Sequence, residues 1–325
     1  MKKKISSFLI SNALSIILIM LGVAATLYNS NFISINNLKN MGTNIGPRFL
    51  IALGVSGCLI TRGTDLSAGR MAALGACITG TLLQRADYVQ KFYPDMGNVN
   101  ILLVLLIAMA ICSVFGFFNG IVISKLKVPP FIATLGMQLM VYGVCLVYTG
   151  ASPLGGFRKD YTSLATTAVL GVPLIVWIAL MVGSLMWFLY NKTRHGKYMY
   201  AIGGNESAAE VSGVNVDRSI IKIYTLAAIL YAFGGFLLAA KAGGATVNTG
   251  QGYELEAIAS CTIGGVSTTG GIGRVSGVLI GVMIFEILKS SLQFLSVDPS
   301  LQYVIQGLVI VAAVALDLRK YLAKK

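Results

Sequence analysis

Long apolar segments separated by short polar connections make up most of the 325-residue chain. A straight helix needs about 20 apolar residues to cross the hydrocarbon core of a bilayer. We interpret ten of the segments as transmembrane helices, some of them short or broken, which predicts an all-α integral membrane protein. Residues 29–43 are predicted to be a polar loop. The ten predicted spans are residues 8–28, 48–60, 71–83, 101–124, 131–148, 169–190, 220–240, 254–263, 275–295 and 301–316.

A short, glycine-containing polar turn interrupts the apolar pattern once in each half of the chain, at residues 63–70 and 264–274. With five spans in each half, the second half would run upside down relative to the first. Paired interruptions in an inverted repeat are typical of a transport pathway. We expect Asp65 to cap the following helix by accepting a hydrogen bond from the backbone of Ser67 or Ala68. The residues predicted to shape this core are Asp65, Ser67, Gly69, Gly264 and Gly265.

Composition supports one membrane domain covering residues 1–325, because 56% of the residues are hydrophobic and only 11% are charged. Soluble domains carry roughly 25% charged residues. The net charge of +13 does not indicate nucleic acid, because the basic residues form short clusters at the ends of apolar segments. Positive charge beside a span marks its cytoplasmic end. This rule places both termini, Arg62, Arg70 and the stretch 193–218 at the cytoplasmic face.

Residues 193–218 form the longest polar stretch, and a short helix is predicted inside it. Ser207 and Glu210 have the spacing of a capping box, and Gly213 is a suitable helix stop. A helix of one or two turns is marginal alone and needs a packing partner. The stretch is therefore interpreted as a cytoplasmic surface for a partner protein, with an ordinary structured loop as the alternative.

Motifs for enzymatic chemistry are missing from the sequence. It contains no G-x-x-x-x-G-K-[ST] loop, so we expect ATP hydrolysis to require a separate subunit. His195 is the single histidine, and the five cysteines form no C-x-x-C pair, so no metal site is predicted.

Acidic residues at membrane level leave a second class of function open. An ionisable group inside a membrane is a functional candidate by default. A transporter driven by a proton or sodium gradient would use Asp65 or Glu286, although Glu286 and Lys289 are spaced to pair on one helix. The predicted membrane-level acids are Asp65, Glu254, Glu256 and Glu286.

Five sequence blocks carry a resemblance that extends over nearly the whole chain. They are GTDLSAGR (63–70), TRHGKYMYAIGGNESAAEVSGVNV (193–216), YELEAIA (253–259), CTIGGVS (261–267) and ALDLRKY (315–321). Together they resemble the permease subunits of bacterial sugar ABC importers. The T-D-L-S-A-G-R form is similar to the galactoside branch, and a permease for ribose or another monosaccharide is the alternative. The loop at 150–161 departs mildly from the family pattern.

The resemblance implies a set of partners and a coupling site. A cytoplasmic ABC ATPase that holds ATP–Mg would dock on the loop 193–218, and an extracytoplasmic sugar-binding protein would deliver the substrate. A second permease subunit would complete the pathway, most simply as a homodimer in the bacterial cytoplasmic membrane. No cofactor is expected on the chain itself. The expected coupling residues are Gly204, Asn205, Glu206, Ser207, Ala208, Ala209, Glu210 and Gly213.

Overall fold

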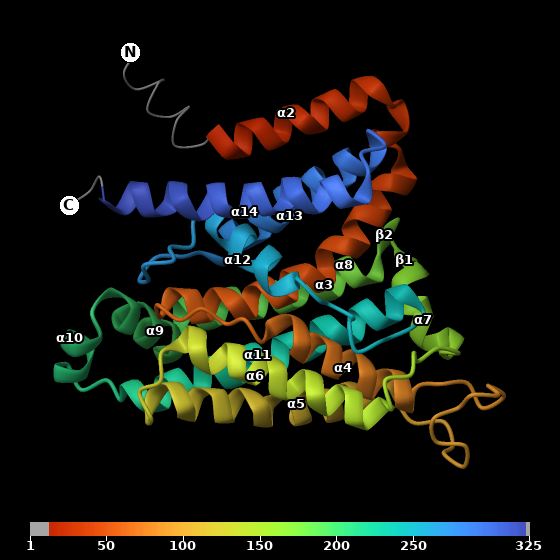
Figure 1. Ribbon diagram of the computed structural model, residues 1–325, viewed down its shortest axis with the longest axis horizontal. Coiled ribbons are helices and arrows are strands. Elements are labelled where there is room, and N and C mark those ends of the chain that lie inside the picture. Colours follow the sequence, from red (N-terminus) through yellow and green to blue (C-terminus); the bar gives the residue numbers. More distant parts are fainter. Residues whose placement is uncertain (1–12, 323–325) are drawn as a thin grey trace.

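The computed structural model describes residues 13–322, and these residues fold as an almost entirely helical bundle (Figure 1). The first part comprises α2 (Ala13–Tyr28), the 3-10 helix η1 (Ser30–Ile33), α3 (Ile35–Ile60), α4 (Ala68–Leu82), α5 (Ile101–Ser124), α6 (Pro130–Thr149) and α7 (Lys159–Thr166). A two-residue hairpin follows, in which β1 (Ala168–Val169) pairs antiparallel with β2 (Val172–Pro173). The remainder comprises α8 (Leu174–Lys192), α9 (Arg194–Gly204), α10 (Glu206–Val211), α11 (Val216–Ala242), α12 (Tyr253–Ile263), α13 (Val275–Phe294) and α14 (Pro299–Leu322).

The bundle has two distinct ends (Figure 1). We call the end on the left, which carries α9 and α10, the coupling end after the role predicted for residues 193–218, and we call the end on the right, which carries α7 and the β-hairpin, the loop end. The described part of α2 begins toward the coupling end, and α14 ends there. The start of the predicted span 8–28 lies outside the described residues, as do Lys2, Lys3, Lys4, Lys324 and Lys325.

The predicted all-α membrane class is confirmed. Within residues 13–322, seven helices are long and apolar enough to cross a membrane, and each predicted span that is described corresponds to a helix. The predicted total of ten is approximate, because α4 and α12 have only 15 and 11 residues and α2 has 16 described residues.

The predicted polar loop at 29–43 was wrong, because these residues form η1 and the first two turns of α3. The Ser34 side chain caps α3 by accepting from the Asn37 backbone N–H at 3.3 Å. The Asn37 amide, which is buried, donates to the Phe32 carbonyl at 2.7 Å. Polar side chains that satisfy backbone groups in this way allow a helix to begin in a polar sequence. The segment expected to be a short span is thus the second half of the 26-residue α3.

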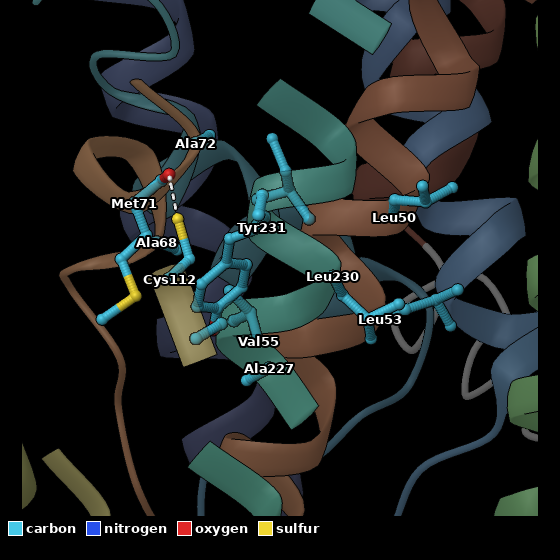
Figure 2. Close-up of a cluster of buried hydrophobic side chains, with 14 of the residues drawn as sticks. Leu50, Leu53, Val55, Ala68, Met71, Ala72, Cys112, Ala227, Leu230 and Tyr231 are labelled. Atoms are coloured by element: carbon cyan, nitrogen blue, oxygen red, sulfur yellow. Dashed lines mark hydrogen bonds between the residues drawn. The ribbon is translucent and has the colours of Figure 1, made fainter. Parts of the chain in front are cut away.

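The core lies where α3, α4, α5 and α11 meet. The most apolar stretches of α3 and α11 are 83% and 72% buried, against 28% for both α5 and α6. Figure 2 shows Tyr231 of α11 between Leu53 of α3 on one side and Met71 of α4 on the other. Cys112 of α5 lies beside Met71, and its thiol donates to the Met71 carbonyl at 3.6 Å. The outer helices expose leucine, valine and phenylalanine, as a surface facing lipid requires.

Two units of the fold run in opposite directions through this core. Each consists of a long helix, a non-helical segment that we call the return segment, and a half-helix. The first is α3, which reaches the coupling end, a return segment at 61–67, and α4. The second is α11, which reaches the loop end, a return segment at 243–252, and α12. The half-helix α4 packs against α5, α6 and α11, and α12 packs against α13, α14 and α3. An inverted repeat is therefore present, with α3–α6 and α11–α14 as its two units.

This repeat differs from the predicted one in its extent and its register. Each unit has four helices rather than five, because α2 and α8 lie outside the matching sets. The structural counterpart of the first return segment is 243–252, not 264–274 as predicted. Residues 264–274 instead connect α12 to α13 at the coupling end, where the Gly271 N–H donates to the Ile60 carbonyl at 2.8 Å.

Candidate functional site

The short helix predicted in the stretch 193–218 is present as α10, but its N-cap differs from the prediction. The Asn205 side chain accepts from the Ala208 backbone N–H at 3.0 Å, so Asn205 is the N-cap and the predicted Ser207–Glu210 capping box was wrong. Ser207 is instead part of the first turn. The helix ends as predicted, because Gly213 adopts a φ of +83° and its N–H donates to the Glu210 carbonyl at 2.9 Å.

Most of the predicted coupling residues are exposed at the coupling end. Ala209 is the exception, with 4% of its surface exposed, because it faces inward from α10. Val211 was not predicted, yet it is 90% exposed, and an apolar side chain so placed is suited to contact with another protein. The exposed predicted residues are Gly204, Asn205, Glu206, Ser207, Ala208, Glu210 and Gly213.

Close backbone contact joins the end of α9 to the end of α3. A Cβ atom on Gly203 would overlap the Ile60 carbonyl oxygen and lie 2.6 Å from the Gly271 nitrogen, so only glycine fits. Arg62, in the left-handed region with φ +63°, donates from Nε to the Gly203 carbonyl at 2.8 Å and from Nη2 to the Gly204 carbonyl at 2.6 Å. Sequence reasoning placed Arg62 correctly at this end but missed its link to α9.

The first return segment is fixed by buried hydrogen bonds around Asp65. One oxygen of Asp65, which is 1% exposed, accepts from the Ser67 N–H at 2.9 Å and from the Ser67 hydroxyl at 2.6 Å. This confirms the predicted bond to the Ser67 backbone, but Asp65 was wrongly predicted to cap the helix, because the N-cap of α4 is Ser67 and no side chain caps this helix. The other oxygen accepts from the Tyr231 hydroxyl of α11 at 3.0 Å. Thr134 of α6 accepts from the Leu66 N–H at 3.1 Å, so α6 and α11 both satisfy polar groups of this extended chain.

The two half-helices meet near their N-termini. A Cβ atom on Gly69 of α4 would overlap the Gly250 carbonyl oxygen and the Glu254 carboxylate at the start of α12. Asp65, Ser67 and Gly69 thus lie in one junction. Gly264 and Gly265 do not share it, because they follow α12 and Gly264 contacts Gly277 of α13.

Arg70 lies at this junction, so its predicted place at the cytoplasmic face was wrong. Its Nη1 atom donates to the Val247 carbonyl at 2.9 Å and to the Asn248 side chain at 3.0 Å. Its guanidinium stacks 4.2 Å from the ring centre of Tyr142 on α6. The charge rule failed here because Arg70 is satisfied by protein groups within the bundle rather than by water at its surface.

A network of four charged side chains crosses the bundle beside the same junction. Arg48 of α3 forms an ion pair with Glu286 of α13 and lies 3.6 Å from Glu256 of α12. Lys289 of α13 pairs with Glu256 at 2.6 Å, and the Asn44 amide donates to Glu286 at 2.6 Å. The predicted Glu286–Lys289 pair was therefore wrong, because each side chain has a closer partner on another helix. The sequence shows these charges but not which helices bring them together.

Metal-binding chemistry finds no support in the described part of the chain, where no three His, Cys, Asp or Glu residues are grouped to hold an ion. The five cysteines are buried, free thiols in the apolar core. His195 lies on α9, where burial lowers the pKa of its imidazole below the usual range. These groups indicate packing rather than catalysis.

Comparison with known proteins identifies the family. Residues 37–314 match the family model described as a branched-chain amino acid transport system / permease component. The chain belongs to this permease family. It is accordingly the membrane subunit of a transport system and not an enzyme, which agrees with the interrupted helices and the exposed α10.

Curated relatives match over nearly the full length. The whole chain is 45% identical to the galactose/methyl galactoside import permease protein MglC of Escherichia coli (strain K12), covering 98% of that protein. It is 43% identical, with the same coverage, to the MglC protein of Haemophilus influenzae. Over 94% of the chain it is 35% identical to the ribose import permease protein RbsC of Escherichia coli (strain K12), covering 92% of that protein. No solved structure matches the chain significantly.

Proposed function

We propose that the chain is the permease subunit of an ATP-driven ABC importer that carries galactose, a methyl galactoside or glucose into the cytoplasm. The higher identity to galactose/methyl galactoside permeases than to the ribose permease supports this substrate class. ATP–Mg is bound by a separate ATPase, consistent with a sequence that has no phosphate-binding loop.

The observation that carries the proposal is the exposed α10 on a rigid support. Six residues of helix stand at the coupling end, capped at both ends and joined to α9. An isolated helix of this length is unstable in water, so its packing and caps hold it in place for a partner. The ATPase docks on this surface, which makes the stretch 193–218 the coupling loop.

The contacts provide a direct route from the coupling loop to the core. Movement of α10 displaces the end of α9, whose carbonyls are held by Arg62. Arg62 is the second residue of the return segment 61–67 that leads to α4. Because this segment is bonded to α6 and α11, a shift of α9 reorients the start of α4 against both helices. Alternating access follows from such movement of packed helices between two arrangements.

The remaining parts of the importer occupy the other surfaces. The sugar-binding protein docks at the loop end, and two copies of the permease form the pathway between them. The coupling end faces the cytoplasm with both chain termini, and the assembly lies in the bacterial cytoplasmic membrane. The lipid-facing helices α5 and α8 carry the apolar surface that this location needs.

A pair of matched valine variants tests the coupling role. Val211→Asp places a charge on the 90% exposed apolar side chain of α10, and Val89→Asp does the same at the loop end, where Val89 is 98% exposed. We expect Val211→Asp to lose the co-purifying ATPase and the ATP hydrolysis stimulated by sugar-loaded binding protein. Val89→Asp retains the ATPase.

Glu210→Lys, a second exposed change on α10, should weaken ATPase recovery in the same way. Ala209→Arg is unsuitable, because Ala209 is buried and the variant would disturb folding. Full ATPase recovery with both Val211→Asp and Glu210→Lys would refute the docking role.

The energy source of uptake tests the alternative function. If uptake persists without ATP and stops when the ion gradient is collapsed, the chain is a gradient-driven transporter and not an importer subunit.

A further inference from the structure

Four polar residues lie along the junction of the half-helices, and we call them the midplane strip. They are Arg70 of α4, Asn248 and Gln251 of the second return segment, and Tyr253 of α12. Asn248 and Gln251 are exposed, and Arg70 and Tyr253 are partly exposed. The backbone of Gln251 is held by its N–H, which donates to the Asn248 carbonyl at 3.0 Å.

The depth of the strip follows from helix length. Arg70 lies about 18 Å along α4 from Leu82, the last residue of α4 at the loop end, at about 1.5 Å per residue. Arg48, which contacts Tyr253, lies about 18–20 Å from either end of α3 by the same measure. The hydrocarbon core of a bilayer is about 30 Å thick. The midplane strip therefore lies near the middle of the membrane.

Exposed amide and guanidinium groups at this depth cannot face lipid. Within the hydrocarbon, polar side chains are found against protein or along a water-filled cavity. The lipid-facing surface of α5 at similar depth is different, since it exposes Val114 and Phe117. A further sign of water is Glu254, which is 8% exposed and whose Oε2 atom has no hydrogen-bond partner among residues 13–322. Buried polar atoms of this kind are usually satisfied by water.

We propose that the midplane strip lines the sugar path and supplies the hydrogen-bonding groups that a monosaccharide meets halfway across the membrane, an inference that rests on the proposed function. A hexose presents hydroxyls that both donate and accept. Asn248 and Gln251 can do both through their amides, whereas Arg70 only donates. The ring of Tyr253 offers an apolar face beside a hydroxyl, which suits the mixed surface of a sugar.

The location of the strip indicates how the path is closed. Arg70 stacks on Tyr142 of α6, and α12 packs against α14, so α6 and α14 flank the strip. These are corresponding helices of the two inverted units. The open side between them is covered by the same face of a second copy, which places two strips opposite each other around one path.

Behind the strip, the charge network holds Tyr253 in place. The Arg48 guanidinium lies 5.3 Å and the Lys289 ammonium 5.8 Å from the centre of the Tyr253 ring. Both cations are held by Glu256. A rigid support of this kind fixes the start of α12, so the groups that meet the sugar are in place before it arrives.

Thiol accessibility tests whether the strip is wetted. The native cysteines are buried, so wild-type protein provides a low background. Gln251→Cys is compared with Val114→Cys, an exposed position near the middle of α5, in the assembled importer in proteoliposomes. We expect a charged methanethiosulfonate to modify Gln251→Cys at least about tenfold faster, because the thiolate forms only in water. Equal rates at the two positions would overturn the proposal.

Transport measurements test the role toward sugar. Gln251→Leu removes the amide, and Gln251→Asn keeps it. Gln251→Leu loses one neutral hydrogen bond to the sugar in the step that limits transport. We therefore expect its maximal rate of methyl galactoside uptake to be roughly threefold to tenfold lower, and Gln251→Asn to recover a substantial part of the rate. Co-purification of the ATPase should be unchanged. Normal uptake by Gln251→Leu would overturn the sugar contact.

The two proposals fail in different ways. If Gln251→Cys is labelled slowly while the wild-type protein takes up methyl galactoside with ATP, the midplane strip does not line the sugar path, but the proposed importer function stands. If Gln251→Cys is labelled rapidly but the wild-type protein takes up ribose and not methyl galactoside with ATP, the midplane strip still lines a sugar path. The assignment of a hexose substrate is then overturned.

Discussion

The charge network predicts an unequal response to removing the two members of its Arg48–Glu286 ion pair. Four charges of balanced sign cross the bundle, and the Arg48–Glu286 pair is the least exposed part, with side chains 15% and 3% exposed. Arg48→Met leaves the Glu286 carboxylate with only the Asn44 amide as a partner. Glu286→Gln leaves Arg48 beside Glu256 at 3.6 Å, so the remaining cation is still compensated. The arginine variant should therefore be the more damaging.

Magnitudes follow from what each change leaves uncompensated. Breaking a buried ion pair from one side typically costs about 3–5 kcal/mol, because a lone charge stays buried. We assign this cost to Arg48→Met and about 1–2 kcal/mol to Glu286→Gln, which loses mainly a charge-assisted hydrogen bond. In the double variant Arg48→Met/Glu286→Gln no charge is stranded, and an amide can still bond Asn44. The double variant should therefore be more stable than Arg48→Met alone by about 2 kcal/mol.

Thermal unfolding in detergent with a fluorogenic maleimide measures these differences, because the five cysteines are buried and react only on unfolding. At about 2 °C per kcal/mol for a large domain, Arg48→Met lowers the midpoint by about 6–10 °C. The double variant recovers about 4 °C of that loss. Equal midpoints for the two single variants, or a double variant less stable than Arg48→Met, would refute the assigned pairing.

Two further changes probe the coupling end. Gly203→Ala forces a methyl group onto the backbone of α3, whereas the added methyl group of Gly204→Ala meets nothing within 4 Å, so only the first should lower the thermal unfolding midpoint. Equal midpoints for the two alanine variants would contradict the close contact. Burial lowers the pKa of His195 in the folded chain, so the unfolded chain takes up this proton more readily. Stability should then fall as the pH drops below about 6.5, the ordinary pKa of histidine. A His195→Gln variant should lose part of that decline in unfolding midpoints between pH 7.5 and 5.5, and an unchanged pH profile would argue against it.

Sequence pattern alone was enough for the class of protein and for most helices. Apolar length is a local property that a bilayer selects directly, so α5 was predicted at residues 101–124 as observed. Local hydrogen bonding was also predictable where both partners are neighbours in sequence, as with Asp65 and Ser67. The short α10 followed from its stop at Gly213, although the cap proved to be Asn205 rather than Ser207.

Errors arose where a polar residue is satisfied by a partner far along the chain. Arg70 was placed at the membrane surface because its partners, Val247 and Asn248, are distant in sequence. The same holds for Glu286, which pairs with Arg48 across the bundle rather than with its own helix. Local spacing gives the separation of groups on one helix but carries no information on which other helix lies against it.

The sequence by itself determined that this chain is a multi-helix membrane protein with one long polar stretch, residues 193–218, and with interrupted helices. Only the tertiary structure decided how the interruptions combine. It paired the return segment 61–67 with 243–252 and brought Gly69 against Gly250. The physical reason is that a broken helix in a membrane needs its free backbone groups satisfied by neighbouring helices, and those neighbours are set by packing of the whole bundle.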